Sequence, residues 1–158
     1  MFTDIVGSTT LNEAMGDVAW ERLIRWHDDT LRGLITKGGG DIVKSMGDGV
    51  FAAFESPRAA VQTAIAIQRA LREHRGGSGF ALSVRIGLHA AEATVRANDY
   101  SGMAVNIASR IGALAGGGEI LASAETLHDA GPVVSSASRD TPIRGAAAPI
   151  SVTTIDWS

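Results

Sequence analysis

Hydrophobic residues recur along the chain with two different periods, one typical of strands and one typical of helices. The clearest strand pattern covers residues 81–89, where Leu82, Val84, Ile86 and Leu88 alternate with polar residues and glycine. The clearest helix pattern runs from about residue 18 to residue 37, with apolar positions spaced mostly by three or four. Both kinds of element are therefore expected in one chain.

Boundary residues place the other elements around these two. Ser56-Pro57 puts an N-cap serine and a first-turn proline at the start of a helix that extends to about His74. The glycine-rich segment 76–79 is predicted to be the linker that follows. The remaining predicted elements are a short strand ending near Asp4, a helix over 11–15, a hairpin over 41–54, a strand over 90–95 that pairs with 81–89, a helix over 103–114, a strand over 119–122, a helix over 124–130 and a strand-like tail over 150–157.

The order of these elements predicts an α+β fold, in which helices pack on one sheet. We expect residues 1–158 to form a single domain, because a chain of this length buries a sufficient core. The first predicted strand begins almost at residue 1, which indicates a piece cut from a longer protein at its N-terminus. An upstream regulatory domain or membrane segment is therefore left open.

Composition and charge narrow the function classes. Hydrophobic residues make up 45% of the chain and charged residues 20%, as in ordinary globular proteins. The formal net charge of −3 argues against a nucleic-acid-binding protein, which normally carries a basic surface. The absence of cysteine excludes disulfides, zinc–thiolate sites and cysteine nucleophiles, and it fits the cytoplasmic location that we expect. No signal peptide and no apolar run of membrane-spanning length is visible.

Two aspartates stand at predicted strand ends, where a metal ion or a phosphate can reach them. Gly47-Asp48-Gly49 forms the tip of the predicted hairpin, and Asp4 ends a short apolar strand. Two carboxylates that converge from separate strands can hold divalent ions through their oxygens. Each aspartate alone is about equally consistent with a residue that caps a turn.

Asp-Ile-Val-Gly-Ser-Thr at 4–9 and Met-Gly-Asp-Gly at 46–49 together resemble the metal-binding motifs of class III nucleotidyl cyclase catalytic domains. The resemblance covers nearly the whole chain. It implies a ferredoxin-like core of the βααββαβ type, with a mixed or antiparallel sheet covered by helices. It also implies two Mg²⁺ or Mn²⁺ ions per active site, bound by Asp4, the backbone carbonyl of Ile5 and Asp48.

Lys44 and Asp99 occupy the places of the base-reading residues in the adenylyl cyclases of this family. A lysine ammonium can donate to adenine N1, and a carboxylate can accept from the exocyclic amine. Guanine presents N1–H and a carbonyl there, so the pair would face it donor to donor and acceptor to acceptor, which is costly in a buried site. A solvated strand lysine and an ordinary loop aspartate are the alternative interpretation.

Asn106 and Arg110 lie at positions i and i+4 of the predicted helix, so their side chains project from one face. Gly-Met-Ala-Val-Asn-Ile-Ala-Ser-Arg at 102–110 resembles the cyclase signature in which the asparagine positions the ribose. The arginine of that signature stabilises charge that develops on the phosphate, a role suited to a permanently charged bidentate donor. A polar surface patch is the alternative interpretation.

Two further arginines match the family less specifically. Arg85 aligns with a strand arginine that contacts the triphosphate, although it fits the polar face of an alternating strand equally well. Arg144 stands where many relatives carry a lysine for the terminal phosphate, and the sequence around it departs from the family pattern. His27 and His89 match no catalytic position, so we expect both to be structural.

The resemblance implies an adenylyl cyclase that converts ATP to 3′,5′-cyclic AMP and pyrophosphate, in a head-to-tail homodimer with its active sites at the subunit interface. One subunit would supply Asp4, Asp48 and Arg85, and the other Lys44, Asp99, Asn106, Arg110 and Arg144. Because one chain carries both sets, a homodimer would contain two complete sites related by a two-fold axis.

Three other functions are left open. A guanylyl cyclase is the nearest, and Lys44 and Asp99 argue against it. A catalytically silent cyclase-homology module, which would dimerise or sense nucleotides, would be favoured by the loss of a catalytic residue, and none is lost. A diguanylate cyclase shares the core fold, but Gly-Gly-Gly-Asp-Ile at 38–42 precedes the predicted hairpin and does not form its tip.

Overall fold

The computed structural model describes residues 1–78, 82–91, 94–96 and 99–158. The helices are α1 (Ser8–Met15), α2 (Asp17–Lys37), α3 (Pro57–Ser78), α4 (Met103–Leu114) and α5 (Ala124–Ala130). The strands are β1 (Phe2–Ile5), β2 (Gly40–Met46), β3 (Gly49–Phe54), β4 (Val84–Leu88), β5 (Thr94–Arg96), β6 (Asp99–Ser101), β7 (Ile120–Ser123), β8 (Arg139–Thr141) and β9 (Ile150–Thr154). None of the described helices is long and apolar enough to cross a membrane.

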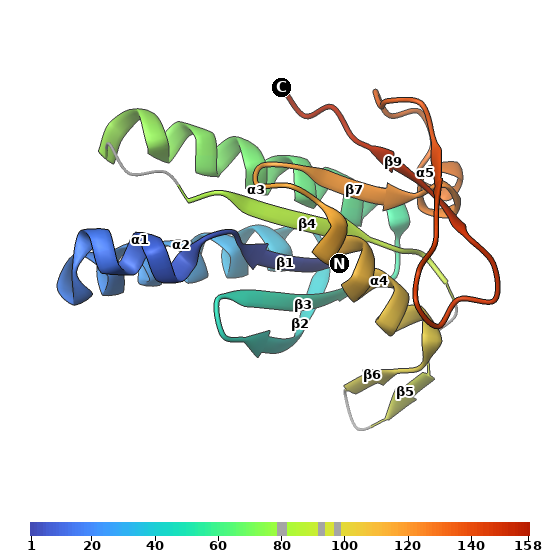
Figure 1. Ribbon diagram of the computed structural model, residues 1–158, viewed down its shortest axis with the longest axis horizontal. Helices are drawn as coiled ribbons and strands as arrows, with labels where there is room; N and C mark the ends of the chain where they lie inside the picture. Colours follow the sequence, from blue (N-terminus) through green and yellow to red (C-terminus); the bar gives the residue numbers. More distant parts are fainter. Residues whose placement is uncertain (79–81, 92–93, 97–98) are drawn as a thin grey trace.

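Seven strands form one mixed sheet in the order β2-β3-β1-β4-β7-β9-β8 (Figure 1). The pairs are antiparallel except for β4 and β7, which run parallel. Strands β5 and β6 form a separate two-stranded ribbon that leads into α4. The predicted α+β class, with a mixed sheet covered by helices, is confirmed.

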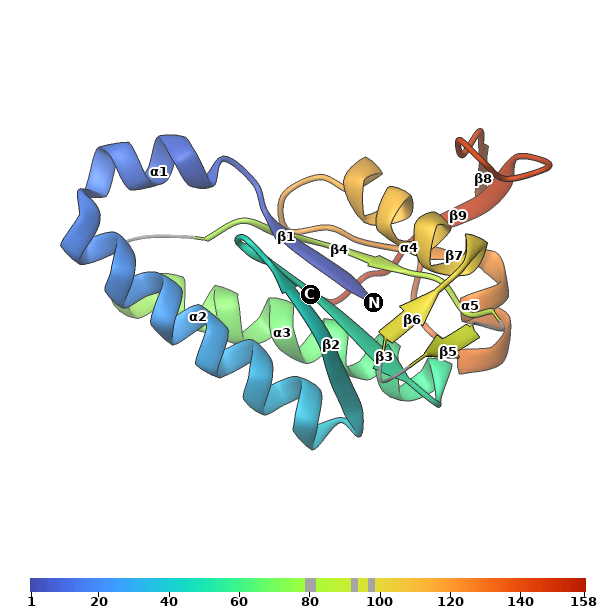
Figure 2. The same cartoon turned by 90° about the horizontal axis from the view of Figure 1, so that it is seen from below.

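The sheet has two differently covered faces, and the two-residue period of its strands assigns the side chains to them. Figure 2 shows α4 on one side of the sheet and α2 and α3 on the other. The side chain of Ile5 belongs to the large core cluster packed against α2 and α3, as does that of Val84. Phe2 instead stacks on Phe51 in a smaller cluster that includes Ala108 of α4. Residues 2 and 4 of β1 therefore face α4.

Several predicted elements differ from the observed ones, and the largest difference is in strand pairing. The segment at 90–95 was predicted to pair with 81–89, and this prediction is wrong. Both edges of β4 are already paired, one with β1 and the other with β7, so no edge is vacant for a hairpin partner. The segment after β4 instead contributes β5, which pairs with β6. Strand β6 was not among the predicted elements.

Helix α3 is longer than predicted and ends at Ser78, because the predicted glycine linker is partly helical. Its buried stripe Ala64, Ile67 and Leu71 fixes the axis of the helix against the core. Continuing such a helix adds one hydrogen bond for each residue ordered, which can outweigh the poor propensity of Gly76 and Gly77. Helices α4 and α5 have the predicted boundaries.

Two glycines meet where helix α4 lies directly against the sheet. A Cβ atom added at Gly87 of β4 would collide with the backbone of Gly112 in α4. A Cβ added at Gly112 would find its nearest neighbours at 3.5 Å, which is ordinary van der Waals contact. The close approach therefore depends on Gly87 and not on Gly112.

Gly87→Ala should force α4 away from the sheet and lower the free energy of unfolding by about 1–3 kcal/mol, the usual cost of overpacking. Gly112→Ala is the matched control, since it adds the same methyl group from the other side of the contact. It should leave stability unchanged or raise it by up to about 1 kcal/mol through helix propensity. Urea unfolding of both variants measures the difference, and equal midpoints would contradict this account of the contact.

Candidate active site

Asp4 and the turn that carries Asp48 lie beside each other at one end of the sheet. Thr3 pairs with Val50, so the next residue of β1 lies level with the start of β3 at the turn. The hydroxyl of Thr3 accepts a hydrogen bond of 3.1 Å from the backbone N–H of Val50. Both aspartates are partly exposed, so their carboxylates are accessible to ions.

Two glycines of the β2–β3 turn have separate reasons to be glycine. Gly47 has a positive φ of 61°, which side chains rarely adopt. Gly49 packs against the backbone of β1, and an added Cβ would collide with the carbonyl oxygen of Thr3. The absence of a side chain at 49 therefore lets the turn bearing Asp48 sit close to Asp4.

Ile5 follows Asp4 and points the other way. Its side chain is 3% exposed and belongs to the large core cluster. Its burial fixes the backbone at the position whose carbonyl the family resemblance assigns to a metal ion.

Arg85 is the direct cross-strand neighbour of Asp4 and forms an ion pair with it. Oδ2 of Asp4 accepts hydrogen bonds from Nε at 2.8 Å and from Nη2 at 2.5 Å. The remaining terminal nitrogen, Nη1, donates to the backbone carbonyl of Ala113 at 3.0 Å. Arg85 thus joins β1 to the last turn of α4.

A hollow of about 250 Å³ opens beside this pair on the α4 side of the sheet. Its lining residues are Phe2, Thr3, Asp4, Met46, Gly49, Arg85, Ser109, Gly112 and Ala113. The hollow therefore brings a carboxylate, a guanidinium and the edge of the β2–β3 turn together in one accessible space.

The donor set at this end fits Mg²⁺ or Mn²⁺ in its chemistry. Carboxylate oxygens are the ligands these ions prefer, and Oδ2 of Asp4 already holds a cationic group, the guanidinium of Arg85. Among the described residues, no group of three or more His, Cys, Asp or Glu could enclose a metal ion. Ions here would thus keep several positions for water or phosphate, as Mg²⁺ usually does.

Asn106 and Arg110 lie on the outer side of α4. Asn106 is exposed and Arg110 is partly buried. A Cβ added at Gly145 would lie 2.8 Å from Nη1 of Arg110, so this guanidinium rests on the segment that follows Arg144. Ile143, on the other side of Arg144, is buried against α4. The structure therefore brings the backbone around exposed Arg144 to the same helix as Arg110.

Lys44 is exposed on β2 and pairs with Phe51, so it stands on the α4 side of the sheet. An irregularity in pairing between Ile42 and Lys44 sets this orientation. The backbone of Asp99 lies in β6, but its side chain falls outside the described part of the structure. The geometry of the predicted base-reading pair is thus described only for the lysine.

The predicted residues fall into two groups in the described structure. Asp4 and Arg85 line the hollow, and Asp48 lies in the adjoining turn. Of the described residues that line this hollow, none is Lys44, Asn106, Arg110 or Arg144. A ligand that contacted both groups would therefore have to extend beyond this hollow.

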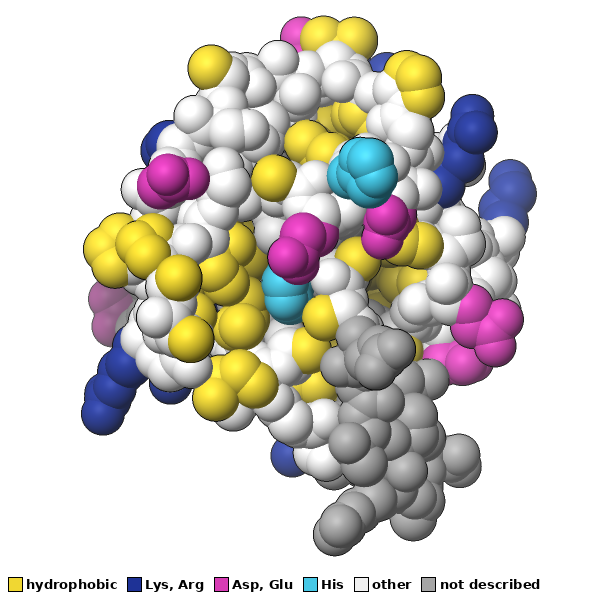
Figure 3. Space-filling view, turned by 90° about the vertical axis from the view of Figure 1, so that its right-hand side faces the viewer, with side chains coloured by type: hydrophobic (Ala, Val, Ile, Leu, Met, Phe, Trp, Pro, Cys, Tyr) yellow, Lys and Arg dark blue, Asp and Glu magenta, His cyan; other side chains and the backbone are white. Residues whose placement is uncertain are grey.

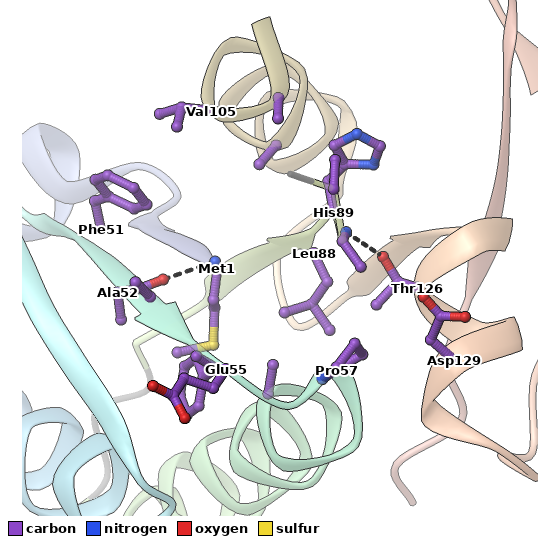
Figure 4. Close-up of a pocket in the computed structure, with 17 residues that line it drawn as sticks. Met1, Phe51, Ala52, Glu55, Pro57, Leu88, His89, Val105, Thr126 and Asp129 are labelled. Atoms are coloured by element: carbon purple, nitrogen blue, oxygen red, sulfur yellow. Dashed lines mark hydrogen bonds between the residues drawn. The ribbon is translucent and has the colours of Figure 1, made fainter. Parts of the chain in front are cut away.

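A larger cavity, of about 570 Å³, lies at the other end of β1 (Figures 3 and 4). Its walls are mainly apolar, with Glu55, His89, Thr126 and Asp129 as polar residues (Figure 4). None of the described residues that line it is lysine or arginine. A triphosphate would meet two carboxylates and no permanent cation there, so this cavity is a poor candidate for the nucleotide site.

His89 belongs to a hydrogen-bonded group beside this cavity. Its Nδ1 lies 2.9 Å from the hydroxyl of Ser123, which lies 2.8 Å from the hydroxyl of Thr126. Burial lowers the pKa of His89, with Glu125 acting in the opposite direction. Ser123 caps α5 and is fully buried, so this group ties His89 to the start of that helix.

Sequence reasoning missed three contributors to the site. These are the hydroxyl of Thr3, the backbone of Gly49 where it meets β1, and the carbonyl of Ala113. Gly49 belongs to the recognised Met-Gly-Asp-Gly motif, but the sequence did not show the contact with β1 that requires glycine there. A backbone carbonyl leaves no mark in the sequence, so no signal could have identified Ala113.

Comparison with protein families gives one match that covers most of the chain. A model described as the adenylate and guanylate cyclase catalytic domain matches residues 1–144. An uncharacterized protein of Mycobacterium tuberculosis is 32% identical over 124 residues, which are 78% of this chain and 32% of the relative. An adenylate cyclase of Glutamicibacter nicotianae is 29% identical over 147 residues, 91% of this chain and 36% of the relative. The chain thus spans about a third of the length of these relatives.

Solved structures agree with this match. The adenylyl cyclase CyaB from P. aeruginosa superposes with a TM-score of 0.79 at 26% identity, over 99% of this chain and 92% of that one. The guanylyl cyclase Cya2 superposes with a TM-score of 0.81 at 25% identity, over 98% and 88%. These two structures, one of an adenylyl and one of a guanylyl cyclase, therefore resemble the chain about equally.

Proposed function

The chain belongs to the adenylate and guanylate cyclase catalytic domain family, and on that premise we propose that it is an adenylyl cyclase that converts ATP to 3′,5′-cyclic AMP and pyrophosphate. The observation that carries the proposal is the convergence of Asp4, Arg85 and the Asp48 turn at one accessible hollow. Carboxylates for divalent ions and an arginine for phosphate are the groups that phosphoryl chemistry requires.

The reaction forms one bond and breaks another at the α-phosphorus. The ribose 3′-oxygen attacks in line, the bond to the β-phosphate oxygen breaks, and pyrophosphate leaves with that electron pair. The 3′-hydroxyl proton goes to solvent or to a substrate phosphate, since no described side chain lining the hollow is an evident base. Two Mg²⁺ or Mn²⁺ ions held by Asp4, the Ile5 carbonyl and Asp48 would acidify the hydroxyl and offset phosphate charge.

The protein's own side chains would bind and orient the nucleotide. Arg85 and Arg144 would hold the outer phosphates, for which a guanidinium is suited because it donates two parallel hydrogen bonds. Asn106 would position the ribose, and Arg110 would stabilise charge on the transferred phosphate.

We propose that these groups come from two copies of the chain. The described residues that line the hollow beside Asp4 do not include Lys44, Asn106, Arg110 or Arg144. This supports a site that is completed by a second subunit. A two-fold homodimer would then contain two equivalent sites. Exposed Met46 at the end of β2 and exposed Met103 at the start of α4 are apolar residues available to such an interface.

The function is tested by incubating the protein with ATP or GTP and Mn²⁺ and identifying the nucleotide product. We expect cyclic AMP from ATP. Asp48→Asn should reduce turnover below detection, because it removes one metal-binding carboxylate. Asp41→Asn is the matched control, since it makes the same change at the far end of β2 and should keep turnover. ATP binding without a cyclic product would instead favour a nucleotide-sensing module.

Base choice gives a second prediction, which concerns Lys44 and Asp99. A site that hydrogen-bonds its substrate can reject an analogue by up to about 10⁴–10⁵ when buried groups lose their partners. Lys44→Glu with Asp99→Gly should therefore lower kcat/KM for ATP by at least about 100-fold, roughly 3 kcal/mol of transition-state stabilisation.

The control for base choice is Lys37→Glu, which reverses the same charge at the exposed end of α2. It should leave the ratio of ATP to GTP turnover unchanged. If the double variant at 44 and 99 keeps the wild-type preference for ATP, these residues do not read the base.

Subunit mixing gives a third prediction. Asp48→Ala and Arg110→Ala should each be inactive, yet a mixed dimer would contain one site with both lesions and one with neither. Random exchange puts about half of the chains in mixed dimers, so about a quarter of wild-type activity should return by symmetry. Asp48→Ala mixed with Asp4→Ala is the control, and it should restore nothing. Equal inactivity of both mixtures, with exchange demonstrated, would place each site within one chain.

A further inference from the structure

Arg85 holds the carboxylate that the proposed function assigns to a metal ion. Its Nε and Nη2 both donate to Oδ2 of Asp4, and neither bond reaches Oδ1. The side chains of Arg85 and Asp4 are 30% and 38% exposed, so the pair is open to solvent and to small ions. The negative charge of Asp4 is therefore already balanced before any ion arrives.

A guanidinium and a divalent cation that share one carboxylate compete for its negative charge. Their charges repel, and arginine cannot relieve the repulsion by losing its proton, because a guanidinium stays charged in proteins. The repulsion therefore favours movement of one of the two. The backbone of Asp4 is fixed in the sheet between β3 and β4, whereas the long side chain of Arg85 can rotate.

The guanidinium of Arg85 would have to move only a short distance to reach phosphate in the hollow. It lies directly opposite Asp4 in the register of β1 and β4, and both line the same hollow. Phosphate oxygens bound in that hollow would offer the guanidinium new acceptors of the same charge. The exchange thus replaces one charge-assisted hydrogen bond with another within the site.

From this arrangement we propose that Arg85 is the counter-ion of Asp4 in the nucleotide-free protein and leaves it for phosphate when a divalent ion binds. The inference rests on the proposed function, because it takes Asp4 as a metal ligand. It adds that metal binding and phosphate binding are coupled through one side chain, with Arg85 opposing the first and supporting the second.

Movement of the Arg85 side chain would also affect helix α4. Nη1 of Arg85 donates to the carbonyl of Ala113, in the last turn of a helix that has no basic residue of its own there. A cation at this end satisfies a carbonyl that has no partner within the helix and favours the helix dipole. Release of Arg85 would therefore loosen the end of the helix that carries Asn106 and Arg110.

Metal binding without nucleotide provides the first test, because it does not depend on turnover. Arg85→Gln should bind Mn²⁺ about fivefold more tightly than wild type in isothermal titration, the order expected for loss of a partly exposed ion pair. Arg85→Lys, which keeps the charge but donates from one point, should lie between the two. Arg58→Ala, which removes an exposed arginine from α3, should match wild type. Turnover of ATP should nevertheless fall in Arg85→Gln.

The second test observes the guanidinium directly by NMR. In wild type the Arg85 Nε–H signal, assigned by its loss in Arg85→Lys, should be protected from exchange and should lose this protection when Mg²⁺ is added. Adding ATP with Mg²⁺ should restore protection at a new chemical shift.

The outcomes separate the two proposals. If wild type binds Mn²⁺ but Arg85→Gln binds it equally or more weakly, the counter-ion role is wrong and the metal site of the proposed function stands. An Nε–H signal that Mg²⁺ leaves unchanged would also overturn the counter-ion role. If neither protein binds Mn²⁺ with or without ATP, the metal site and the inference are both wrong.

Discussion

The register of β1 between β3 and β4 is the constraint on which the rest of the site depends. It sets Phe2 opposite Phe51 and Asp4 opposite Arg85. Since side chains alternate between faces, a slip of one residue would turn Asp4 into the core beneath α2 and α3. A carboxylate buried there without a partner would be costly, so the apolar pattern and the site require the same register.

Two close backbone contacts position the β2–β3 turn and helix α4 against these strands. Gly49 lets the turn with Asp48 lie against β1, and Gly87 lets α4 lie against β4. The hydrogen bond from Arg85 to Ala113 then ties the end of α4 to the same strand pair. The site therefore sits where several elements are held by packing, which suits groups that have to keep a defined geometry.

The proposed base-reading residue Lys44 lies apart from this arrangement. It stands on β2 and is not among the described residues that line the hollow beside Asp4. Under the proposed function, the metal and phosphate contacts would be common to cyclases of either base, and side chains outside the hollow would decide between ATP and GTP. This separation explains why similarity of fold does not by itself assign the substrate.

The sequence by itself determined the fold class, most helices, the central hairpin and the residue types of the site. Helices α4 and α5 were predictable because their apolar period and boundary residues act locally. Strand partners were not, and the prediction for 90–95 was wrong because both edges of β4 are taken by strands remote in sequence. Arg85 was equally consistent with a solvated strand residue, because the pattern of its own strand does not show that β1 and Asp4 lie beside it.

Only the tertiary structure decided that Asp4 and Arg85, 81 residues apart, form an ion pair and that the carbonyl of Ala113 completes the contact. Register and helix position follow from the packing of whole faces of the sheet, including the absence of a Cβ at Gly87. These contacts depend on distances between elements, whereas the pattern of a single segment records only which of its own residues face the core.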